Sequence, residues 1–355
     1  MPDKKKPLSD SFGGRHEKGS EFSAHGHSER VSRYGQRRKR GKALAGFIQA
    51  TQQHRPDLIT IAGKVQQCAS WLLFRNYYTV DQVRLAGAYT CQKHLLCPFC
   101  AARRGAISAS KYSERLTHIV QKRHDLIPVM LTLTLKNGPD LEERFNHFMT
   151  SLRKLLMKRR DADRGKTVTE LSKAVGGVYS VETTNKGKGW HVHLHAVLLL
   201  DAYLDREALS REWFKITGDS TILDVRRLAR GVSDMTDNQG NITPKIAEAF
   251  CEVFKYALKF SDLDYQDNVT AFEVMRGKRL MGSFGLFRGV QVPDSLLDDP
   301  LAGLPYLDMI YRFDGNAYQL IQTRDDHPST IRGYLHPAPV TANPLPLILP
   351  LKKPC

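Results

Sequence analysis

The stretch Trp190-His191-Val192-His193-Leu194-His195-Ala196, continued by the apolar run up to Leu200, decides the fold. Polar and apolar residues alternate along it, which predicts a β-strand over residues 191–200. On such a strand the three histidines share one face, while Val192, Leu194 and Ala196 point into a core. The preceding Asn185-Lys186-Gly187-Lys188-Gly189 predicts a hairpin turn. This strand therefore pairs with the strand expected before the turn.

The pattern outward from this strand predicts an α+β fold. In chain order we expect a strand at 128–135, a helix at 140–160, strands at 178–182 and 191–200, a helix at 205–215, a strand at 222–228 and a helix at 244–260. This order is typical of a split βαβ arrangement. It predicts an antiparallel sheet with helices on one face, preceded by a cysteine-rich segment. Asp314-Gly315-Asn316 predicts one further hairpin.

The histidine strand is a candidate metal site. Two imidazoles at alternate positions of a rigid strand can bind one divalent ion, and Glu182 on the neighbouring strand can add an oxygen ligand. Such a mixed set suits Mg²⁺ or Mn²⁺, which also bind phosphate oxygens. The residues alone leave the choice between the pairs 191/193 and 193/195 open. The alternative is a surface strand with three solvated histidines.

The helix expected at 244–260 carries a second candidate. Ile246, Phe250, Val253, Ala257 and Phe260 form its apolar stripe. Glu252, Tyr256 and Lys259 lie on one flank of that stripe. A phenol beside a metal-bound phosphate can act as a nucleophile, and an ammonium can stabilise the developing charge. The alternative is a tyrosine that only packs at the border of the core.

The cysteines predict a zinc site. Cys97-Pro98-Phe99-Cys100 is a tight pair, and Cys91 and Cys68 lie upstream. Four thiolates suit a closed, structural zinc site, with His94 as an alternative ligand. Free or buried cysteines are the other interpretation. Arg103 and Arg104 follow, where we expect them to offer charge to phosphates.

Charge and hydropathy narrow the class of protein. The 355 residues contain 53 Lys and Arg against 37 Asp and Glu, a net charge of +16 with a pI near 9.6. A surplus of this size favours a polyanionic partner, such as nucleic acid. No apolar run approaches the length that spans a bilayer, and the N-terminus lacks a secretory signal. We therefore expect no membrane partner, a cytoplasmic location and reduced thiols.

Taken together, these motifs resemble the HUH endonucleases, and within them the single-tyrosine plasmid rolling-circle replication initiators. The resemblance covers residues 65–290. It rests on Met130-Leu131-Thr132-Leu133-Thr134, on His193-Leu194-His195, on Glu252 to Lys259 with Tyr256 inside it, and on the cysteine segment. Arg279 to Phe287 is similar to the region that follows the nuclease core in this family. The fold that this resemblance implies is the RRM-like HUH nuclease fold.

The resemblance implies a mechanism. It assigns the metal pair to His193 and His195, whereas the third ligand, Glu182 here, varies within the family. Tyr256 would cleave the origin strand, keep the 5′ phosphate and free a 3′ hydroxyl. Glu252, four residues before the tyrosine, would activate water for the closing cleavage. The partners would be single-stranded and double-stranded plasmid origin DNA and a host helicase and polymerase, with a homodimer left open.

Composition, together with this resemblance, divides the chain into five parts. These are a basic, disordered arm at 1–60, a zinc-binding segment and helix at 61–125, the nuclease core at 126–265, a C-terminal extension for DNA binding or oligomerisation at 266–335, and a proline-rich tail at 336–355. The basic run Arg37-Arg38-Lys39-Arg40, with Lys42, is expected to be a solvated cluster that either contacts DNA phosphates or only keeps the arm soluble. Two other functions are consistent with the pattern, a rolling-circle-type transposase and a non-catalytic zinc-dependent DNA-binding protein.

Overall fold

The computed structural model describes residues 24–230, 234–237, 242–255 and 262–325. Its helices are α1 (Ala24–Thr51), α2 (Pro56–Gln67), α3 (Pro98–Val120), α4 (Leu141–Ala162), the 3-10 helix η1 (Glu170–Lys173), α5 (Arg206–Thr217), α6 (Pro244–Phe254) and α7 (Tyr265–Met275). Its strands are β1 (Trp71–Tyr77), β2 (Gln82–Ala88), β3 (Ile127–Thr134), β4 (Ala174–Asn185), β5 (Trp190–Leu200), β6 (Leu223–Arg227), β7 (Met281–Gly285), β8 (Leu307–Phe313) and β9 (Tyr318–Asp325). Among the described residues, no helix has the length and hydropathy that a bilayer crossing needs.

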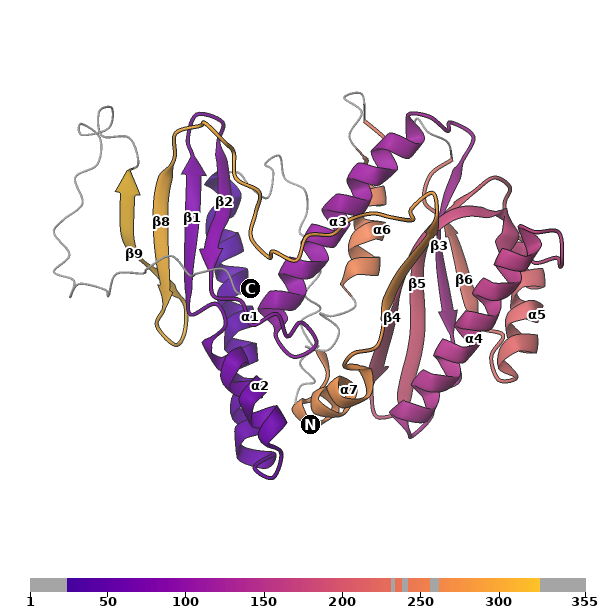
Figure 1. Cartoon of the computed structure of the whole chain (residues 1–355), viewed down its shortest axis with the longest axis horizontal. Helices are drawn as coiled ribbons and strands as arrows, with labels where there is room; N and C mark the ends of the chain where they lie inside the picture. The colour runs from indigo at the N-terminus through magenta and orange to yellow at the C-terminus, as the bar shows by residue number, and fades with distance from the viewer. Residues whose placement is uncertain (1–23, 231–233, 238–241, 256–261, 326–355) are drawn as a thin grey trace, which may run out of the picture.

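The strands form two antiparallel sheets, shown side by side in Figure 1. The large sheet has the order β6-β3-β5-β4-β7, and the small sheet has the order β2-β1-β8-β9. The order β6-β3-β5-β4, with α4 and α5 as the connections, is the predicted split βαβ arrangement. The predicted hairpin at 185–189 is confirmed, because β4 ends at Asn185 and β5 begins at Trp190. The prediction of an α+β fold with an antiparallel sheet is confirmed.

Helices cover both faces of the large sheet, so the prediction of helices on one face is wrong. Leu194, Ala196 and Leu198 pack in one core with α4 and α5, as Phe148 and Trp213 illustrate. On the opposite, histidine-bearing face, Val197 and Leu199 of β5 are also buried and pack with α3 and α6. The apolar run at 196–200 explains this difference, because a strand with apolar residues on both faces needs a cover on both.

The small sheet combines strands from both ends of the described chain. β1 and β2 form a hairpin near the start, and β8 pairs with β1 in the register Leu73↔Ile310. The predicted hairpin at Asp314 to Asn316 is confirmed, because it joins β8 to β9. The chain thus leaves the small sheet after β2, builds the large sheet and returns.

Helix α1 packs on one face of the small sheet, so the prediction of a disordered arm over residues 1–60 is wrong from residue 24 onward. Val31, Tyr34, Leu44 and Ile48 are buried in its core. The sequence shows few large apolar groups here, and the arginines make up part of the interface. Arg30 donates to the carbonyl oxygen of Val83 at 2.7 Å.

The basic run of α1 also departs from the predicted solvated cluster. Arg38 is buried and donates to the carbonyl oxygen of Cys68. The guanidinium of Arg40 lies 4.2 Å from the ring centroid of Tyr265. Lys39 donates to the side-chain oxygen of Asn316 at 2.9 Å. These cations therefore tie α1 to the small sheet and to α7.

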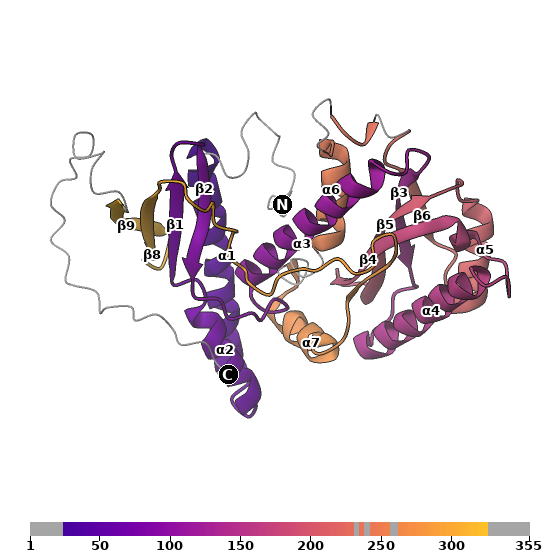
Figure 2. The ribbon, with the colours of Figure 1, turned by 45° about the horizontal axis from the view of Figure 1, so that its top comes forward.

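Helix α3 connects the two sheets. Its first residues lie under the small sheet at the cysteines, and its later part packs against α6 on the large sheet, as Figures 1 and 2 both show. The helix predicted at 106–123 therefore exists but begins earlier, at Pro98. Proline at a first helical position explains this start, because its missing N–H has no partner there.

Candidate active site

The structure brings Glu182, His193 and His195 together on one face of the large sheet. Glu182 on β4 lies directly across from His193 on β5. The Glu182 Oε2 atom is 3.4 Å from His193 Nε2 and 3.9 Å from His195 Nε2. One ligand atom from each of the three side chains lies within 4.8 Å of the others. This spacing is that of a group able to hold one metal ion.

The environment of Glu182 fits a cation. Its side chain is 0% exposed, and neither carboxylate oxygen has a hydrogen-bond partner. A buried charge without a partner is costly, so buried carboxylates are normally paired or bound to metal. The imidazoles of His193 and His195 are the groups that face Glu182. A divalent ion between the three side chains would satisfy the carboxylate without protonating either ring.

A second contact orients the imidazole of His195. The Nδ1 atom of His195 is hydrogen-bonded to the Thr132 hydroxyl at 3.1 Å, which leaves Nε2 directed at Glu182. Burial lowers the pKa of His195 below its ordinary value, so its ring is neutral and able to bind a cation at neutral pH. Thr132 lies opposite His195 on β3, inside the segment that resembles the first family motif. Metal-binding histidines typically have such a partner at the second nitrogen.

His191 lies just outside this cluster. Its ring stacks on that of His193 with centroids 4.9 Å apart, and its Nδ1 is 2.8 Å from the side-chain oxygen of Asn137. The amide nitrogen of Asn137 donates to the carbonyl oxygen of Lys188, which fixes the amide orientation. His191 Nδ1–H therefore donates to Asn137. Burial, with His193 adding to it, lowers the pKa of His191 to about 4.

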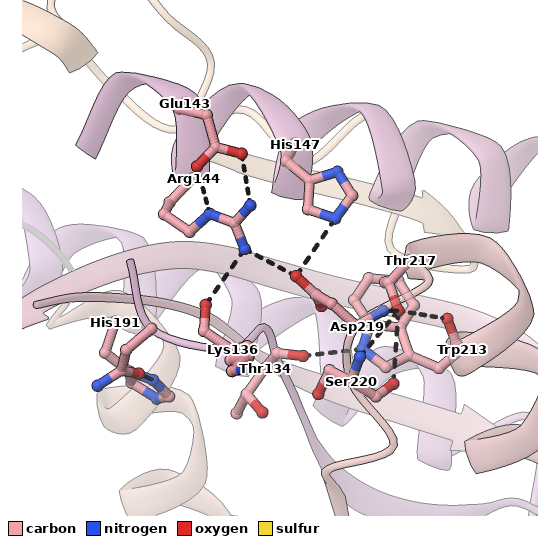
Figure 3. Close-up of polar contacts among 11 residues, drawn as sticks. Thr134, Lys136, Glu143, Arg144, His147, His191, Trp213, Thr217, Asp219 and Ser220 are labelled. Atoms are coloured by element: carbon pink, nitrogen blue, oxygen red, sulfur yellow. Dashed lines mark hydrogen bonds and ion pairs between the residues drawn. The ribbon is translucent and has the colours of Figure 1, made fainter. Parts of the chain in front are cut away.

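A polar network supports the loop that carries Asn137 (Figure 3). Arg144 of α4 contacts the carbonyl oxygen of Lys136 at 3.4 Å and Asp219 at 2.7 Å. The indole of Trp213 donates to the carbonyl oxygen of Thr134 at 2.9 Å. The end of β3 is thus held by α4, by α5 and by the loop that follows α5. These contacts fix the edge of the site next to His191.

Helix α6 brings a second carboxylate to the same face. Glu252 Oε1 lies 3.8 Å from His195 Nε2, and Lys255 forms an ion pair with Glu252. The Ser180 hydroxyl donates to the carbonyl oxygen of Val253 at 2.6 Å, which anchors the last turn of α6 to β4. The described part of α6 ends at Phe254. Tyr256 and Lys259 lie outside the described residues.

The four cysteines form a compact, buried cluster. Cys68 ends α2, Cys91 follows β2, and Cys97 and Cys100 begin α3. Their sulfur atoms lie within 4.8 Å of one another, and none is in a disulfide. Such a group can hold a metal such as zinc. His94, the alternative ligand, is not part of the cluster that the described residues form.

The thiols of this cluster compete for protons. Hydrogen bonds among them, more than burial, raise the pKa of Cys97 and of Cys100 and lower the pKa of Cys91. A bound divalent ion would remove this competition, because all four cysteines can bind it as thiolates.

Arg103 does not offer its charge to phosphates as predicted. Its side chain is buried, pairs with Asp298 at 2.6 Å and donates to the carbonyl oxygen of Leu296 at 2.8 Å. Arg104 donates to the carbonyl oxygen of Pro293 at 2.6 Å. Both arginines hold the segment that returns to the small sheet.

Three residues of the site were missed from the sequence. Thr132, Asn137 and Lys255 contact His195, His191 and Glu252, respectively. The signal for Lys255 was its spacing, three residues after Glu252 on one helix. Thr132 and Asn137 carry no local signal, because their partners lie on other elements.

Comparison with known proteins gives the class of this protein. A family model described as "Replication protein" (Rep_1) matches residues 82–302, which include both the cysteine pair and the histidine strand. The chain belongs to this family.

Curated relatives agree with that assignment. A protein named "Protein rep" from Streptococcus pneumoniae serotype 2 (strain D39 / NCTC 7466) is 25% identical over 279 residues, covering 72% of this chain and 78% of the relative. "Protein rep" from Lentilactobacillus hilgardii is 24% identical, covering 65% and 74%, and "Protein rep" from Lactiplantibacillus plantarum is 26% identical, covering 67% and 76%. No solved structure matches significantly.

Proposed function

We propose that this chain initiates plasmid rolling-circle replication by nicking and closing one strand of origin DNA through Tyr256. The observation that carries the proposal is the pair of unsatisfied, buried Glu182 oxygens beside His193 and His195. A replication protein with such a group of metal-binding side chains has the parts that a metal-dependent DNA nuclease needs.

The proposed metal ligands are Glu182, His193 and His195. A Mg²⁺ or Mn²⁺ ion bound there would polarise a phosphate oxygen of the scissile linkage. Thr132 keeps Nδ1 of His195 occupied, so that Nε2 faces the carboxylate. The neutral state of His195, which follows from its lowered pKa, leaves this nitrogen available at physiological pH.

In the first cleavage, the phenol oxygen of Tyr256 bonds to phosphorus while the bond from phosphorus to the 3′ oxygen breaks. The 5′ phosphate stays on the tyrosine, and the phenolic proton is balanced by the proton that the released 3′ hydroxyl gains. Lys259 stabilises the negative charge that develops on the phosphate. The free 3′ hydroxyl can then serve as a primer.

In the closing cleavage, Glu252 accepts a proton from water as the water oxygen bonds to phosphorus and a second 3′ oxygen leaves. The position of Glu252 next to His195 supports this role, because it lies at the edge of the proposed metal site. Lys255 forms an ion pair with Glu252 and so helps to hold its carboxylate in place.

The test is a covalent adduct. Single-stranded oligonucleotides tiled across the replication origin of the replicon that carries the gene, incubated with the protein and Mn²⁺, should give a protein–DNA adduct that chelator prevents. Tyr256→Phe should give none. Tyr265→Phe, a tyrosine on α7, is the matched control and should retain the adduct. An adduct from the Tyr256 variant equal to that of the unaltered protein refutes the nucleophile.

The two alternative functions give different results in the same system. A rolling-circle-type transposase would excise or insert a mobile element in cells. Many of these enzymes, however, have two tyrosines one helical turn apart, whereas Glu252 stands one turn before Tyr256 here. A non-catalytic zinc-dependent DNA-binding protein would bind DNA unchanged after loss of Tyr256 and both histidines, and would cut no strand.

A further inference from the structure

The small sheet has one face that α1 covers and one face that no described helix covers (Figures 1 and 2). Phe74, Leu85 and Met309 lie on the α1 side and are buried. The strand registers identify the side chains of the other face, because residues directly opposite each other in antiparallel strands point the same way. We call this other face the open face.

The cross-strand pairs on the open face are rich in arginine. Arg84, Arg75, Asp308 and Arg324 form one row across all four strands, in the order β2, β1, β8, β9. Trp71 and Arg312 are direct partners in a second row. Between the rows lie Leu73 and Ile310. Four arginines and one aspartate give this face a formal charge of +3 (4 − 1). Arg75 pairs with Asp308 at 3.2 Å and lies over the ring of Tyr306. Arg84 donates to the side-chain oxygen of Gln82 at 2.7 Å.

Trp71 is placed to stack on a base. Gly87 has no side chain, and a Cβ built there would lie 3.1 Å from the indole of Trp71, so the ring packs directly against the backbone of β2. Trp71 is half-buried, whereas Trp190 and Trp213 are buried. An aromatic ring on a sheet surface flanked by arginines is the arrangement with which sheets bind single-stranded nucleic acid.

We propose that the open face of the small sheet is a second DNA site, which binds single-stranded DNA by stacking on Trp71 and by phosphate contacts to Arg84, Arg312 and Arg324. It lies on a different sheet from the histidine cluster. Helix α3 connects the two sheets. The proposal of DNA as the ligand rests on the proposed function.

The experiment measures binding in chelator, where no strand is cut. A labelled 30-nucleotide single strand is titrated with the full chain at several salt concentrations. The double variant Arg84→Glu/Arg312→Glu should bind at least tenfold more weakly, with a smaller salt dependence. Trp71→Ala should also weaken binding about tenfold, and the unaltered protein should show tryptophan quenching that Trp71→Phe lacks.

The matched control is Arg211→Glu/Lys215→Glu, which makes the same charge change on the exposed outer side of α5. It should retain most of the affinity. Equal losses in both double variants, or unchanged binding in the open-face variants, would overturn the proposal. A loss of affinity for duplex DNA with unchanged affinity for the single strand would also overturn the proposal, because stacking on Trp71 requires unpaired bases.

Cleavage of a short oligonucleotide that spans only the nick site separates this proposal from the proposed function. The open-face variants should cleave it at the rate of the unaltered protein. If neither the unaltered protein nor the variants cleave the oligonucleotide, but the open-face variants bind the single strand more weakly, the nuclease proposal fails and the open-face proposal stands. If cleavage depends on Tyr256 while binding is unchanged in the variants, the open face fails alone.

Discussion

Gly105 of α3 lies against the carbonyl oxygen of Phe254 at the end of α6. A Cβ at Gly105 would be 2.7 Å from that oxygen, closer than a real side chain can be. On the other side, the Ser180 hydroxyl binds the carbonyl oxygen of Val253. The last turn of α6 is therefore held between α3 and β4, and the chain continues from it directly to Tyr256. Small displacements of this turn should affect the chemistry strongly.

Gly105→Ala should lower adduct formation at least tenfold while leaving Mn²⁺ binding unchanged, because α6 moves and the histidine strand does not. Gly63→Ala is the matched control, since it also replaces a helical glycine and meets nothing within 4 Å. In the absence of a clash, alanine favours a helix by about 1 kcal/mol. Single-turnover cleavage measures the effect on adduct formation, and thermal unfolding measures the effect on stability. Equal cleavage by the two variants would show that this contact has no role.

Thr132→Val should weaken Mn²⁺ binding about 10- to 100-fold, because His195 loses the hydrogen bond that orients its ring. Thr132→Ser keeps the hydroxyl and should keep the affinity. Calorimetric titration without DNA measures the binding. His195→Ala gives the lower limit of the Mn²⁺ affinity. If Thr132→Val binds Mn²⁺ as tightly as the unaltered protein, Thr132 has no role in metal binding.

Glu252→Ala should make the first cut and then turn over poorly. The residue lies at the edge of the site, 3.8 Å from His195, and its proposed task is to activate water in the closing step. The variant should therefore accumulate as the covalent adduct. Lys255→Ala tests the ion pair and should show a weaker form of the same effect. Normal release by Glu252→Ala would rule out this task.

Acid should weaken the fold through His27. Its ring is buried, its Nε2 lies 3.0 Å from the Tyr311 hydroxyl, and burial, with Arg30 adding to it, lowers its pKa from 6.5 to about 4. Between these values the unfolded chain takes up a proton that the folded chain does not. The free energy of unfolding should therefore fall as pH falls, by up to about 1.4 kcal/mol per unit. His27→Gln should flatten this slope in urea unfolding from pH 7 to 4.5, and equal slopes would contradict the assignment.

Freshly purified protein should contain close to one equivalent of zinc at the cysteine cluster. Removing the metal should loosen α3, because Cys97 and Cys100 form its first turn. Elemental analysis measures the metal, and less than about half an equivalent would count against a four-thiolate zinc site. Cys251→Ser, at a cysteine outside the cluster, should leave the zinc content unchanged.

Periodicity predicted the large sheet well, because its core strands and connecting helices follow local patterns. The strands β3 and β5 and the helices α4 and α5 lie within a few residues of the predicted ranges. The proximity of Glu182 to the histidine strand was also accessible, since a tight hairpin makes the two strands neighbours. Metal binding by this group, and the roles of Tyr256 and Lys259, stay predictions.

Elements that depend on distant partners were not predictable. Helix α1 is too polar to indicate burial, and its arginines find their acceptors only in the folded chain, as Arg30 does at Val83. The pairing of β1 with β8 joins segments more than 200 residues apart, which no local pattern records. The buried state of Arg103 depends in the same way on Asp298.

The return of the chain to its first sheet has a consequence for synthesis. While residues 89–306 are being translated, β1 has no neighbour on one edge, and β8 completes it only when residue 313 is made. At ordinary translation speeds this delay is on the order of 10 to 50 seconds. A polypeptide broken off anywhere in that interval keeps an unpaired strand edge, which favours aggregation and proteolysis. Incomplete copies that contain the proposed nicking residues but lack β8 should therefore be the ones most exposed to aggregation and proteolysis.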